Sequence, residues 1–598
     1  MRDLIDRRRL LKGAAAFGAA AVAGPALAQG EAADLILLNG RVTTMDPARP
    51  EARAFAVRGG AFVAVGSEAE VAALRGPFTR VIDAGGKRVI PGLIDSHTHS
   101  IRGGVNYAYE VRWDDVDSLE EGLHLLRLQA ERTPEGQFVR VVGGFSEHQF
   151  KEKRLPTVAE LDAVAPEHPV LVHHLYKLTL MNSRAIAAVG YDRADRPSYP
   201  GGVIELDAAG EPTGRLISDP SGLLMYKTLT KAPKLSIADQ INSSMHYMDE
   251  LNALGLTSVS DAGGGGMAFP EADAYRVVRW LHERGLMTVR TAYHTFPKVK
   301  GEEYADYERW TSEWRPQQGD DMLKLVGGGE NLTWASYDFE IFGEPIPDID
   351  PDAEAIQHRI MTLLGEREWP FRQHITYGQT ADRLLAVYED VARGAGLTPG
   401  WFVDHVETFT PAHLERIARL GGGINLQNRL QFQAEDFVAQ HGAEALAKTP
   451  DFRAILDLGV PVGLGTDATR VASYNPWYAL QWLSTGLSRG GMRMYADDNL
   501  LDREEALRLM TVGSAWFSGD AGRKGAIAPG QMADFAVLDR DYFAVTDAEI
   551  AKVSAALTAV GGEVVYADGD LAPHDLRALP PITPDWSPVI AFGDHRER

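Results

Sequence analysis

The chain has 598 residues, of which 45% are hydrophobic and 24% charged, the ordinary balance of a soluble globular protein. This length is too great for one simple core and suits a large barrel with a smaller attached domain. A formal net charge of −23 argues against nucleic acid or an anionic membrane as a partner, and zero cysteines exclude disulfides, thiolate ligands and a cysteine nucleophile.

Residues 1–28 predict an export signal rather than part of the fold. Three arginines at 7–9 precede an apolar stretch at 13–24 and a small-x-small cleavage site at 26–28. The segment resembles a twin-arginine signal, although Leu10 replaces the usual Phe. The apolar run is too short and too rich in Gly and Ala to span a membrane comfortably. We therefore expect the twin-arginine export machinery as a partner, a periplasmic or secreted bacterial location, and no stable membrane anchor after cleavage.

Both ends of the remaining chain predict strands of one small β-sandwich, at 29–90 and 516–598. Segments 34–38 and 41–44 flank Asn39-Gly40, which is a strong hairpin signal, and 54–57 with 61–65 predict a second hairpin. Strand-like runs resume at 530–538 and 562–566, before a Pro-rich tail at 580–586 that we expect to lie extended on the surface.

The middle of the chain, residues 91–515, alternates strands with amphipathic helices, which is typical of a (β/α)8 barrel of the TIM type. An insertion with strands of its own is expected at about 136–225. Apolar runs that end in ionisable residues predict barrel strands at 257–261, 322–326, 371–374, 401–405 and 461–467. In such a barrel the carboxyl ends of the strands meet at one face, where catalytic sites lie.

The first of these strands ends in His97-Thr98-His99. Residues two apart on a strand point the same way, roughly 6–7 Å apart, so both imidazoles can hold one metal ion. Imidazole suits zinc, iron, nickel or copper. Asp95 shares that face and could join the ligands or orient one of them. Two ordinary polar histidines at a strand end are the alternative.

Other strand ends extend this pair to a ligand set that suits two divalent ions. The set consists of His97, His99, Lys324, His374, His405 and Asp467. An ammonium beside two cations is repelled, so Lys324 would have to be carbamylated to serve as an anionic bridge. Taken singly, Lys324 could pair with an acidic neighbour and each histidine could be an ordinary core residue. Taken together and in this order, they favour a metal site.

The sequence resembles the amidohydrolase superfamily, in the branch that includes N-substituted formamide deformylase, from about Asp34 to Tyr542. The segments that carry the resemblance are 91–99, 255–263, Lys324, His374, 403–407, 465–467 and 529–535. It implies that His97, His99 and Asp467 serve one metal ion, zinc being the first candidate. His374 and His405 would serve the second ion, with carbamylated Lys324 as the bridge. The chain departs from the family at 375–379 and at Tyr176-Lys177, so substrates should not be transferred.

The resulting hypothesis is metal-dependent hydrolysis of a C–N bond, of the amide or N-formyl type, in a small molecule. A metal-bridged hydroxide would attack, and Asp467 would act as general base and then acid. Four residues are candidates for substrate contact: His148, Lys177, Trp334 and Arg470. The partners expected are a small-molecule substrate and a second copy in a homodimer.

Two alternatives stay open at this point. The first is a mononuclear deaminase or other C–N or C–O hydrolase, which should survive Lys324→Ala. The second is an exported protein that keeps the amidohydrolase scaffold only to bind a small ligand, because such barrels host many activities.

Overall fold

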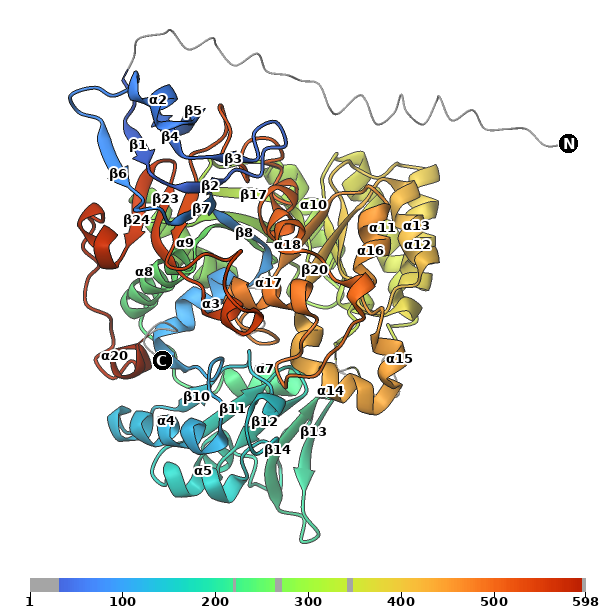
Figure 1. The fold of residues 1–598 in the computed structure, drawn as a ribbon. Helices are drawn as coiled ribbons and strands as arrows, with labels where there is room; N and C mark the ends of the chain where they lie inside the picture. Colours follow the sequence, from blue (N-terminus) through green and yellow to red (C-terminus); the bar gives the residue numbers. More distant parts are fainter. Residues whose placement is uncertain are drawn as a thin grey trace, which may run out of the picture.

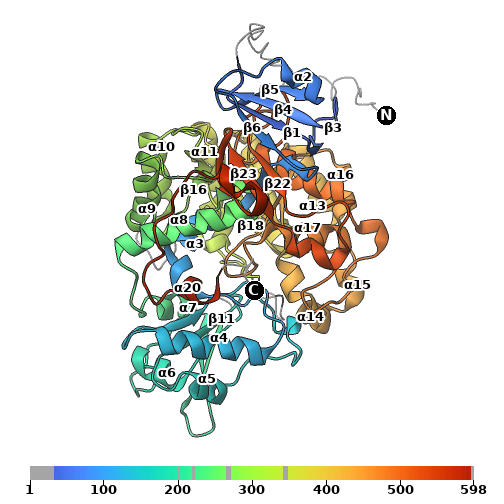
Figure 2. The same cartoon turned by 60° about the vertical axis from the view of Figure 1, so that its left-hand side comes forward.

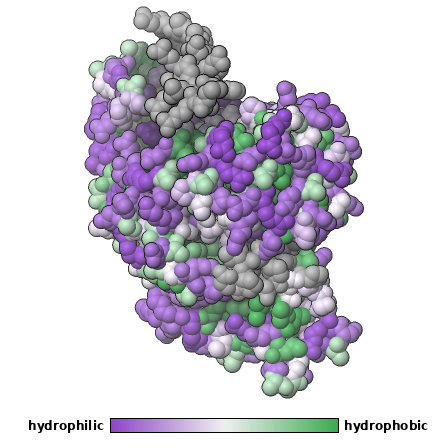
Figure 3. Space-filling view, turned by 90° about the vertical axis from the view of Figure 1, so that its right-hand side faces the viewer, coloured by the Kyte–Doolittle hydropathy of each residue, from purple (hydrophilic) through white to green (hydrophobic). Residues whose placement is uncertain are grey.

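The structure is a computed structural model that describes residues 32–199, 201–218, 222–263, 271–340, 342 and 348–593. A β-rich part, a central α/β part and a separate sheet with its own helices follow one another along the molecule (Figures 1 and 2). The predicted export signal lies outside the described residues. Among the described helices, none is long and apolar enough to cross a membrane. Hydrophilic residues predominate on the face of the molecule shown in Figure 3.

Both ends of the chain build the β-rich part. Its strands are β1 (Leu35–Leu38), β2 (Arg41–Thr43), β3 (Glu51–Ala52), β4 (Ala54–Arg58), β5 (Ala61–Gly66), β6 (Arg80–Asp83), β7 (Arg88–Pro91), β22 (Phe535–Leu538), β23 (Ala555–Val560) and β24 (Glu563–Ala567). They form a four-stranded sheet in the order β5-β4-β1-β6 and a six-stranded sheet in the order β24-β23-β22-β7-β2-β3. Strand β22 pairs antiparallel with β7, which joins the two ends of the chain.

The two sheets share one apolar core. Phe55 lies with its ring centroid 5.1 Å from that of Phe62 and 4.8 Å from that of Phe535, so rings from both sheets and both chain ends are in contact. The predicted hairpin across Asn39-Gly40 is wrong, because β1 and β2 pair in different sheets. The turn carries the chain from one sheet to the other, which buries Val42 in the shared core. The second predicted hairpin, β4 with β5, is confirmed.

The central part holds eight parallel strands. They are β8 (Leu93–Thr98), β15 (Leu256–Asp261), β16 (Arg290–Thr295), β17 (Leu323–Gly328), β18 (Arg372–Ile375), β19 (Phe402–His405), β20 (Gly423–Gln427) and β21 (Val462–Gly465). Two sheets result, in the orders β17-β16-β15-β8 and β18-β19-β20-β21. Gly328 forms a parallel bridge with Phe371, and the Asp467 amide donates to the His97 carbonyl at 2.7 Å, so the sheets meet along both edges. This arrangement is consistent with a TIM-type barrel.

Helices lie between successive strands of the central part. The main ones are α8 (Ile237–Ala253), α9 (Glu271–Glu283), α10 (Glu303–Glu313), α11 (Ala353–Glu366), α12 (Gly378–Arg393), α13 (Pro411–Leu420), α14 (Arg429–His441), α17 (Pro476–Thr485) and α18 (Arg503–Arg508). Helix α13 begins at Pro411 after the N-cap Thr410, and Gly421 ends the helix with a φ of 77°. Asp502 caps α18, and Glu505 completes a capping box.

A separate sheet lies at the end of the molecule opposite the β-rich part (Figure 1). Its order is β13-β14-β12-β11-β10-β9. The elements are β9 (Glu110–Val111), α4 (Leu119–Arg132), β10 (Val139–Val141), α5 (Val158–Val164), β11 (Val170–His174), β12 (Leu178–Met181), α6 (Ser183–Val189), β13 (Gly202–Leu206), β14 (Pro212–Ser218) and α7 (Leu223–Leu229). The sheet begins before the predicted start at 136, because a two-residue strand shows no periodicity in the sequence.

The C-terminal tail binds two helices of different parts. Asn242 of α8 donates to the Pro581 carbonyl at 3.0 Å and accepts from the Thr583 amide at 2.7 Å. Gln129 of α4 donates to the Trp586 carbonyl at 2.9 Å. The extended strap expected from the Pro-rich sequence therefore fastens the separate sheet to the central part, before the short helix α20 (Pro588–Phe592).

Candidate metal centre

Histidines and carboxylates from several strands meet at the carboxyl ends of the central strands. His97 lies in β8, His374 in β18 and His405 at the end of β19, while His99 begins the short helix α3 (Ser100–Asn106) and Asp467 follows β21. All five are buried. Four groups of ligand atoms within 4.8 Å of one another occur in the described ranges, and three of them overlap here: His97, His405 and Asp467; His97, His99 and Glu330; and Glu330, His374 and His405.

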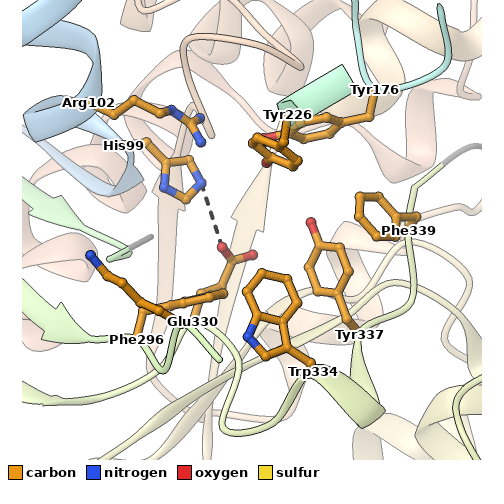
Figure 4. Close-up of a pocket in the computed structure, with 10 residues that line it drawn as sticks. His99, Arg102, Tyr176, Tyr226, Phe296, Glu330, Trp334, Tyr337 and Phe339 are labelled. Carbon is orange, nitrogen blue, oxygen red and sulfur yellow. Dashed lines mark hydrogen bonds and ion pairs between the residues drawn. The ribbon is translucent and has the colours of Figure 1, made fainter. Parts of the chain in front are cut away.

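Glu330, which follows β17, lies at the centre of this cluster. Its Oε1 is 2.6 Å from Nδ1 of His374 and 3.1 Å from Nε2 of His405. On the other side, His97 Nε2 is 3.8 Å from Oε1 and His99 Nε2 is 3.6 Å from Oε2. Figure 4 shows the Glu330 carboxylate directed at His99. One carboxylate thus faces all four histidines.

Lys324, the predicted bridge, lies elsewhere. It is the second residue of β17, so roughly 13 Å of strand separate it from Gly328 at the carboxyl end. Its Nζ donates to Oδ1 of Asp520 at 2.7 Å in a buried ion pair, and Asp520 also pairs with Lys524 at 3.0 Å. Lys324 therefore pairs with an acidic neighbour, as the sequence analysis allowed. The prediction that carbamylated Lys324 bridges the metal site is corrected, because Glu330 occupies the central position.

Hydrogen bonds fix which nitrogen of His97 and His99 faces the cluster. His97 Nδ1 lies 2.9 Å from Oδ1 of Asp404, and His99 Nδ1 lies 3.0 Å from the Gly263 carbonyl. Both Nε2 atoms then face Oδ1 of Asp467, at 3.4 and 3.3 Å. Partners of this kind set the ring orientation and tautomer of metal-binding histidines.

Buried polar residues hold these partners in turn. Arg372 donates to both oxygens of Asp404, at 2.6 and 2.8 Å, and Asn425 donates to Oδ1 at 2.9 Å. Asp95 accepts from the amides of His97 and Thr466, each at 3.1 Å, and from the Thr466 hydroxyl at 2.6 Å. Asp95 therefore orients the ligand strands β8 and β21 rather than joining the ligands.

The cluster's electrostatics suit cation binding. Burial and the charge of Arg429 lower the pKa of His405 well below its usual value, so its imidazole is neutral at neutral pH. Burial opposes ionisation of Asp467, but the charges of His97 and His99 and their hydrogen bonds together outweigh it and hold the pKa of that carboxyl well below its ordinary value. The neutral His405 imidazole and the ionised Asp467 carboxylate are the states in which such side chains bind metal.

Two of these residues have left-handed backbone conformations that side chains other than glycine rarely adopt. Asp467 has a φ of 58° and His405 a φ of 83°. Such conformations cost of order 1–3 kcal/mol each and persist only where the surroundings impose them, typically at active sites. The strain therefore indicates that both side chains are held in place for a purpose other than stability.

The donor set fits a divalent metal. His97 Nε2 and His405 Nδ1 are buried, and within the described ranges neither has a hydrogen-bond partner. A buried ring nitrogen without a partner is costly unless another ligand satisfies it. Imidazole nitrogens with carboxylate oxygens, and no thiolate, form the usual ligand set of hydrolytic zinc sites.

A cavity opens beside Glu330 and His99, with an empty volume of about 500 Å³. Its walls are His99, Arg102, Tyr176, Tyr226, Phe296, Lys298, Glu330, Trp334, Tyr337 and Phe339 (Figure 4). Tyr176 follows β11 and Tyr226 lies in α7, so the separate sheet supplies one wall and the central part supplies the ligands. The cavity therefore places an aromatic wall beside the candidate metal ligands His99 and Glu330.

The predicted substrate residues divide into two groups. Trp334 lines the cavity, and Arg470 lies buried with its guanidinium 4.8 Å from the centroid of the Tyr226 ring. His148 and Lys177 instead lie beside Asp436 of α14, at 3.5 and 2.7 Å, and do not line it. They contact the helix across the boundary between the separate sheet and the central part.

Sequence reasoning missed Glu330, Asp404's contact with His97, and Arg102. The signal for Glu330 was present: it is the first ionisable residue after the glycines that end β17. The strand was predicted to end at 326, which left Lys324 as the candidate nearest its carboxyl end. Arg102 had no such signal, because its neighbours Tyr176 and Tyr226 are distant in sequence.

The sequence model of the amidohydrolase family matches residues 80–566. The chain is 27% identical to N-substituted formamide deformylase of Arthrobacter pascens, over 89% of this chain and 98% of that protein. It is 25% identical to Protein LONG AFTER FAR-RED 3 of Arabidopsis thaliana, over 90% and 92%. A metal-dependent hydrolase of Pyrococcus furiosus of uncharacterised function shares the fold, with a TM-score of 0.60 and 20% identity over 85% and 99% of the two chains. With its histidine and carboxylate cluster, the chain belongs to the amidohydrolase family and is a metal-dependent hydrolase.

Proposed function

We propose that this enzyme hydrolyses a C–N bond, of the amide or N-formyl type, in a small molecule. The observation that carries the proposal is the position of Glu330, within 3.8 Å of all four histidines, with Asp467 facing His97 and His99. The likeness to a formamide deformylase over nearly its whole length supports the choice of bond. The two parallel sheets would close as a (β/α)8 barrel around this site.

Two divalent ions, with zinc as the first candidate, would be held by this ligand set. His97, His99 and Asp467 would hold one, His374 and His405 the other, and Glu330 would be shared. A solved atrazine chlorohydrolase variant of Arthrobacter aurescens, with a TM-score of 0.50, is complexed with zinc and atraton, which supports zinc in this fold. When bound, such ions polarise the substrate carbonyl and lower the pKa of water at the site.

Asp467 would move the proton. Its carboxylate is ionised in the neutral range because its pKa is held low, so it can take the proton of the attacking water. It would then deliver that proton to the leaving nitrogen. The strained backbone at Asp467 aims the carboxylate between His97 and His99, 3.4 and 3.3 Å away.

Export through the twin-arginine machinery to the periplasm or beyond, and a homodimer, remain proposals that rest on the sequence. The first is supported by the arginines, the short apolar stretch and the cleavage site within residues 1–28.

Metal stoichiometry tests the proposal. Elemental analysis of the purified protein should find about two equivalents of zinc, manganese or a similar ion, and a library of formamides, amides and esters should then reveal turnover. The matched variants Glu330→Gln and Lys324→Met should differ, because only the first removes a ligand. One equivalent, unchanged in Glu330→Gln, would favour the mononuclear deaminase or other hydrolase. If the protein binds a ligand but turns over no substrate, and if Asp467→Asn binds that ligand equally well, the protein is a binding protein rather than an enzyme.

A further inference from the structure

The cavity contains a buried cation that the proposed reaction does not use. Arg102 lies in α3 directly after the metal-ligand histidines of β8, and only 5% of it is exposed. Its guanidinium points into the cavity beside His99 and opposite the aromatic wall (Figure 4). Tyr176 faces the guanidinium, and the Tyr176 hydroxyl also accepts a hydrogen bond from Tyr226 at 3.0 Å.

Among the described residues, this guanidinium contacts the Tyr176 hydroxyl but has no carboxylate partner. Its Nε and Nη2 have no hydrogen-bond partner among the described residues, and no described carboxylate forms an ion pair with it. Arg372 and Arg429 are also buried, but each has a carboxylate partner, Asp404 and Glu407 respectively. A buried charge without a partner costs several kcal/mol as an order of magnitude. Some group absent from the chain itself should therefore compensate Arg102.

A second buried arginine adds to the uncompensated positive charge beside the cavity. Arg470 is buried with its guanidinium over Tyr226, and its Nη1 likewise lacks a hydrogen-bond partner in the described part of the chain. Burial and the neighbouring charge of Arg102 lower the pKa of Arg470, so the two guanidiniums are close enough to repel each other. An anion placed beside Arg102 would relieve this repulsion.

The metal ligands do not supply that anion. Glu330 and Asp467 lie close to Arg102, but they face the histidines, and the bound ions would neutralise them. The opposite side of the cavity is aromatic, with Trp334, Tyr337 and Phe339 in mutual ring contact at 6.1 and 4.1 Å. The cavity thus offers metal ligands, a cation and an apolar wall within one volume of about 500 Å³.

We propose that the substrate is an aromatic amide that carries a carboxylate, with Arg102 binding the carboxylate and the Trp334–Phe339 wall binding the ring. Arg102 is then a specificity residue. This inference rests on the proposed function, because it takes the scissile bond to be an amide or N-formyl bond. A guanidinium binds a carboxylate through two parallel N–H donors, and its free Nε and Nη2 form such a pair.

Matched substrates test the inference. N-formylphenylalanine and N-formylphenethylamine differ only by the carboxylate and contain the same scissile bond. Wild type should favour the first by about 10- to 100-fold in kcat/KM, the range of a charge-assisted hydrogen bond. In Arg102→Met the preference should disappear through a rise in KM for N-formylphenylalanine, while the bound metal content stays at the wild-type level, which shows that the variant folds. Lys177→Met, which removes a cation outside the cavity, should keep the preference.

Calorimetry with non-reacting probes separates this inference from the reaction itself. 3-Phenylpropanoate should bind wild-type holoenzyme about tenfold or more tightly than 3-phenylpropan-1-ol, and Arg102→Met should remove the difference. If neither formamide is hydrolysed, the proposed bond is wrong, yet the calorimetry still decides on the anion site. Equal binding of both probes would overturn the inference. A carboxylate preference unchanged in Arg102→Met would also overturn it, since the anion would then bind the metal or Lys298, which also lines the cavity.

Discussion

The two ends of β17 carry ionisable residues with opposite roles. At the amino end, Lys324 is paired with Asp520, whose other oxygen pairs with Lys524, so each charge there has a partner within the protein. At the carboxyl end, Glu330 faces four histidines, two of which have ring nitrogens that no described residue satisfies. A buried charge that is satisfied within the protein supports stability, and a cluster that is left incomplete indicates a ligand. The difference separates a structural ion pair from a functional site.

Replacing Glu330 should have the largest effect. Glu330→Gln keeps the shape of the side chain but removes the charge shared by both candidate ion sites. We expect the bound metal to fall below one equivalent and activity to fall by more than about 100-fold, since even residues outside the ligand set cost 10–100-fold. Elemental analysis and turnover measure both. Full metal content in this variant would place the bridging ligand elsewhere.

Replacing Asp404 should weaken the site without removing a ligand. Asp404→Asn loses the charge that holds Nδ1 of His97 and leaves Arg372 without its ion-pair partner. We expect metal affinity to fall by about 10- to 100-fold, the usual effect of losing a partner of a metal-binding histidine. Competition with a chelator measures the change. Asn425→Ala, which removes a neutral donor to the same carboxylate, is the control and should have a smaller effect.

The sequence sufficed for the parts of the site that follow from local pattern. His97 and His99 stand two apart at a strand end, and His374, His405 and Asp467 end later strands, so one rule about strand ends predicts all five. The rule failed at β17, because the strand extends to Gly328 and its carboxyl end carries Glu330 rather than Lys324. The role of Arg102 could not be predicted, because it depends on how the separate sheet packs against the central part, and no local sequence pattern indicates that packing.

Replacing Lys324 should leave the site intact but destabilise the fold. Lys324→Met is expected to keep its metal, while the free energy of unfolding falls by about 1–3 kcal/mol, because Asp520 keeps Lys524 and Arg523 as partners. Chemical denaturation of the holoenzyme measures the loss. A variant that folds normally but loses its metal would contradict the separation of the two ends of β17.

The stability of Lys324→Met relative to wild type should also depend on pH. Burial opposes ionisation of Asp520, but the charges of Lys524 and Lys324 outweigh it and hold the pKa of Asp520 below its ordinary value of 3.8. A carboxyl group with a lowered pKa in the folded state stabilises the fold above about pH 4, and this contribution is lost as the pH falls towards the lowered pKa. The stability difference between wild type and Lys324→Met should therefore be constant above about pH 5 and shrink below pH 4. A difference that grows in acid would contradict the ion pair.

The smallest effect should come from changes at a second group of possible ligands, which has the same residue types as the metal centre but is more exposed. Glu147, His148 and Asp436 place ligand atoms within 4.8 Å of one another, yet all three are only half-buried, and Lys177 already pairs with Asp436 at 2.7 Å. An ion pair that is this exposed contributes about 0–1 kcal/mol. Lys177→Met should thus change stability by less than about 1 kcal/mol and kcat for the uncharged formamide by less than about threefold. A loss of metal in His148→Ala would instead show that this cluster is a second metal site.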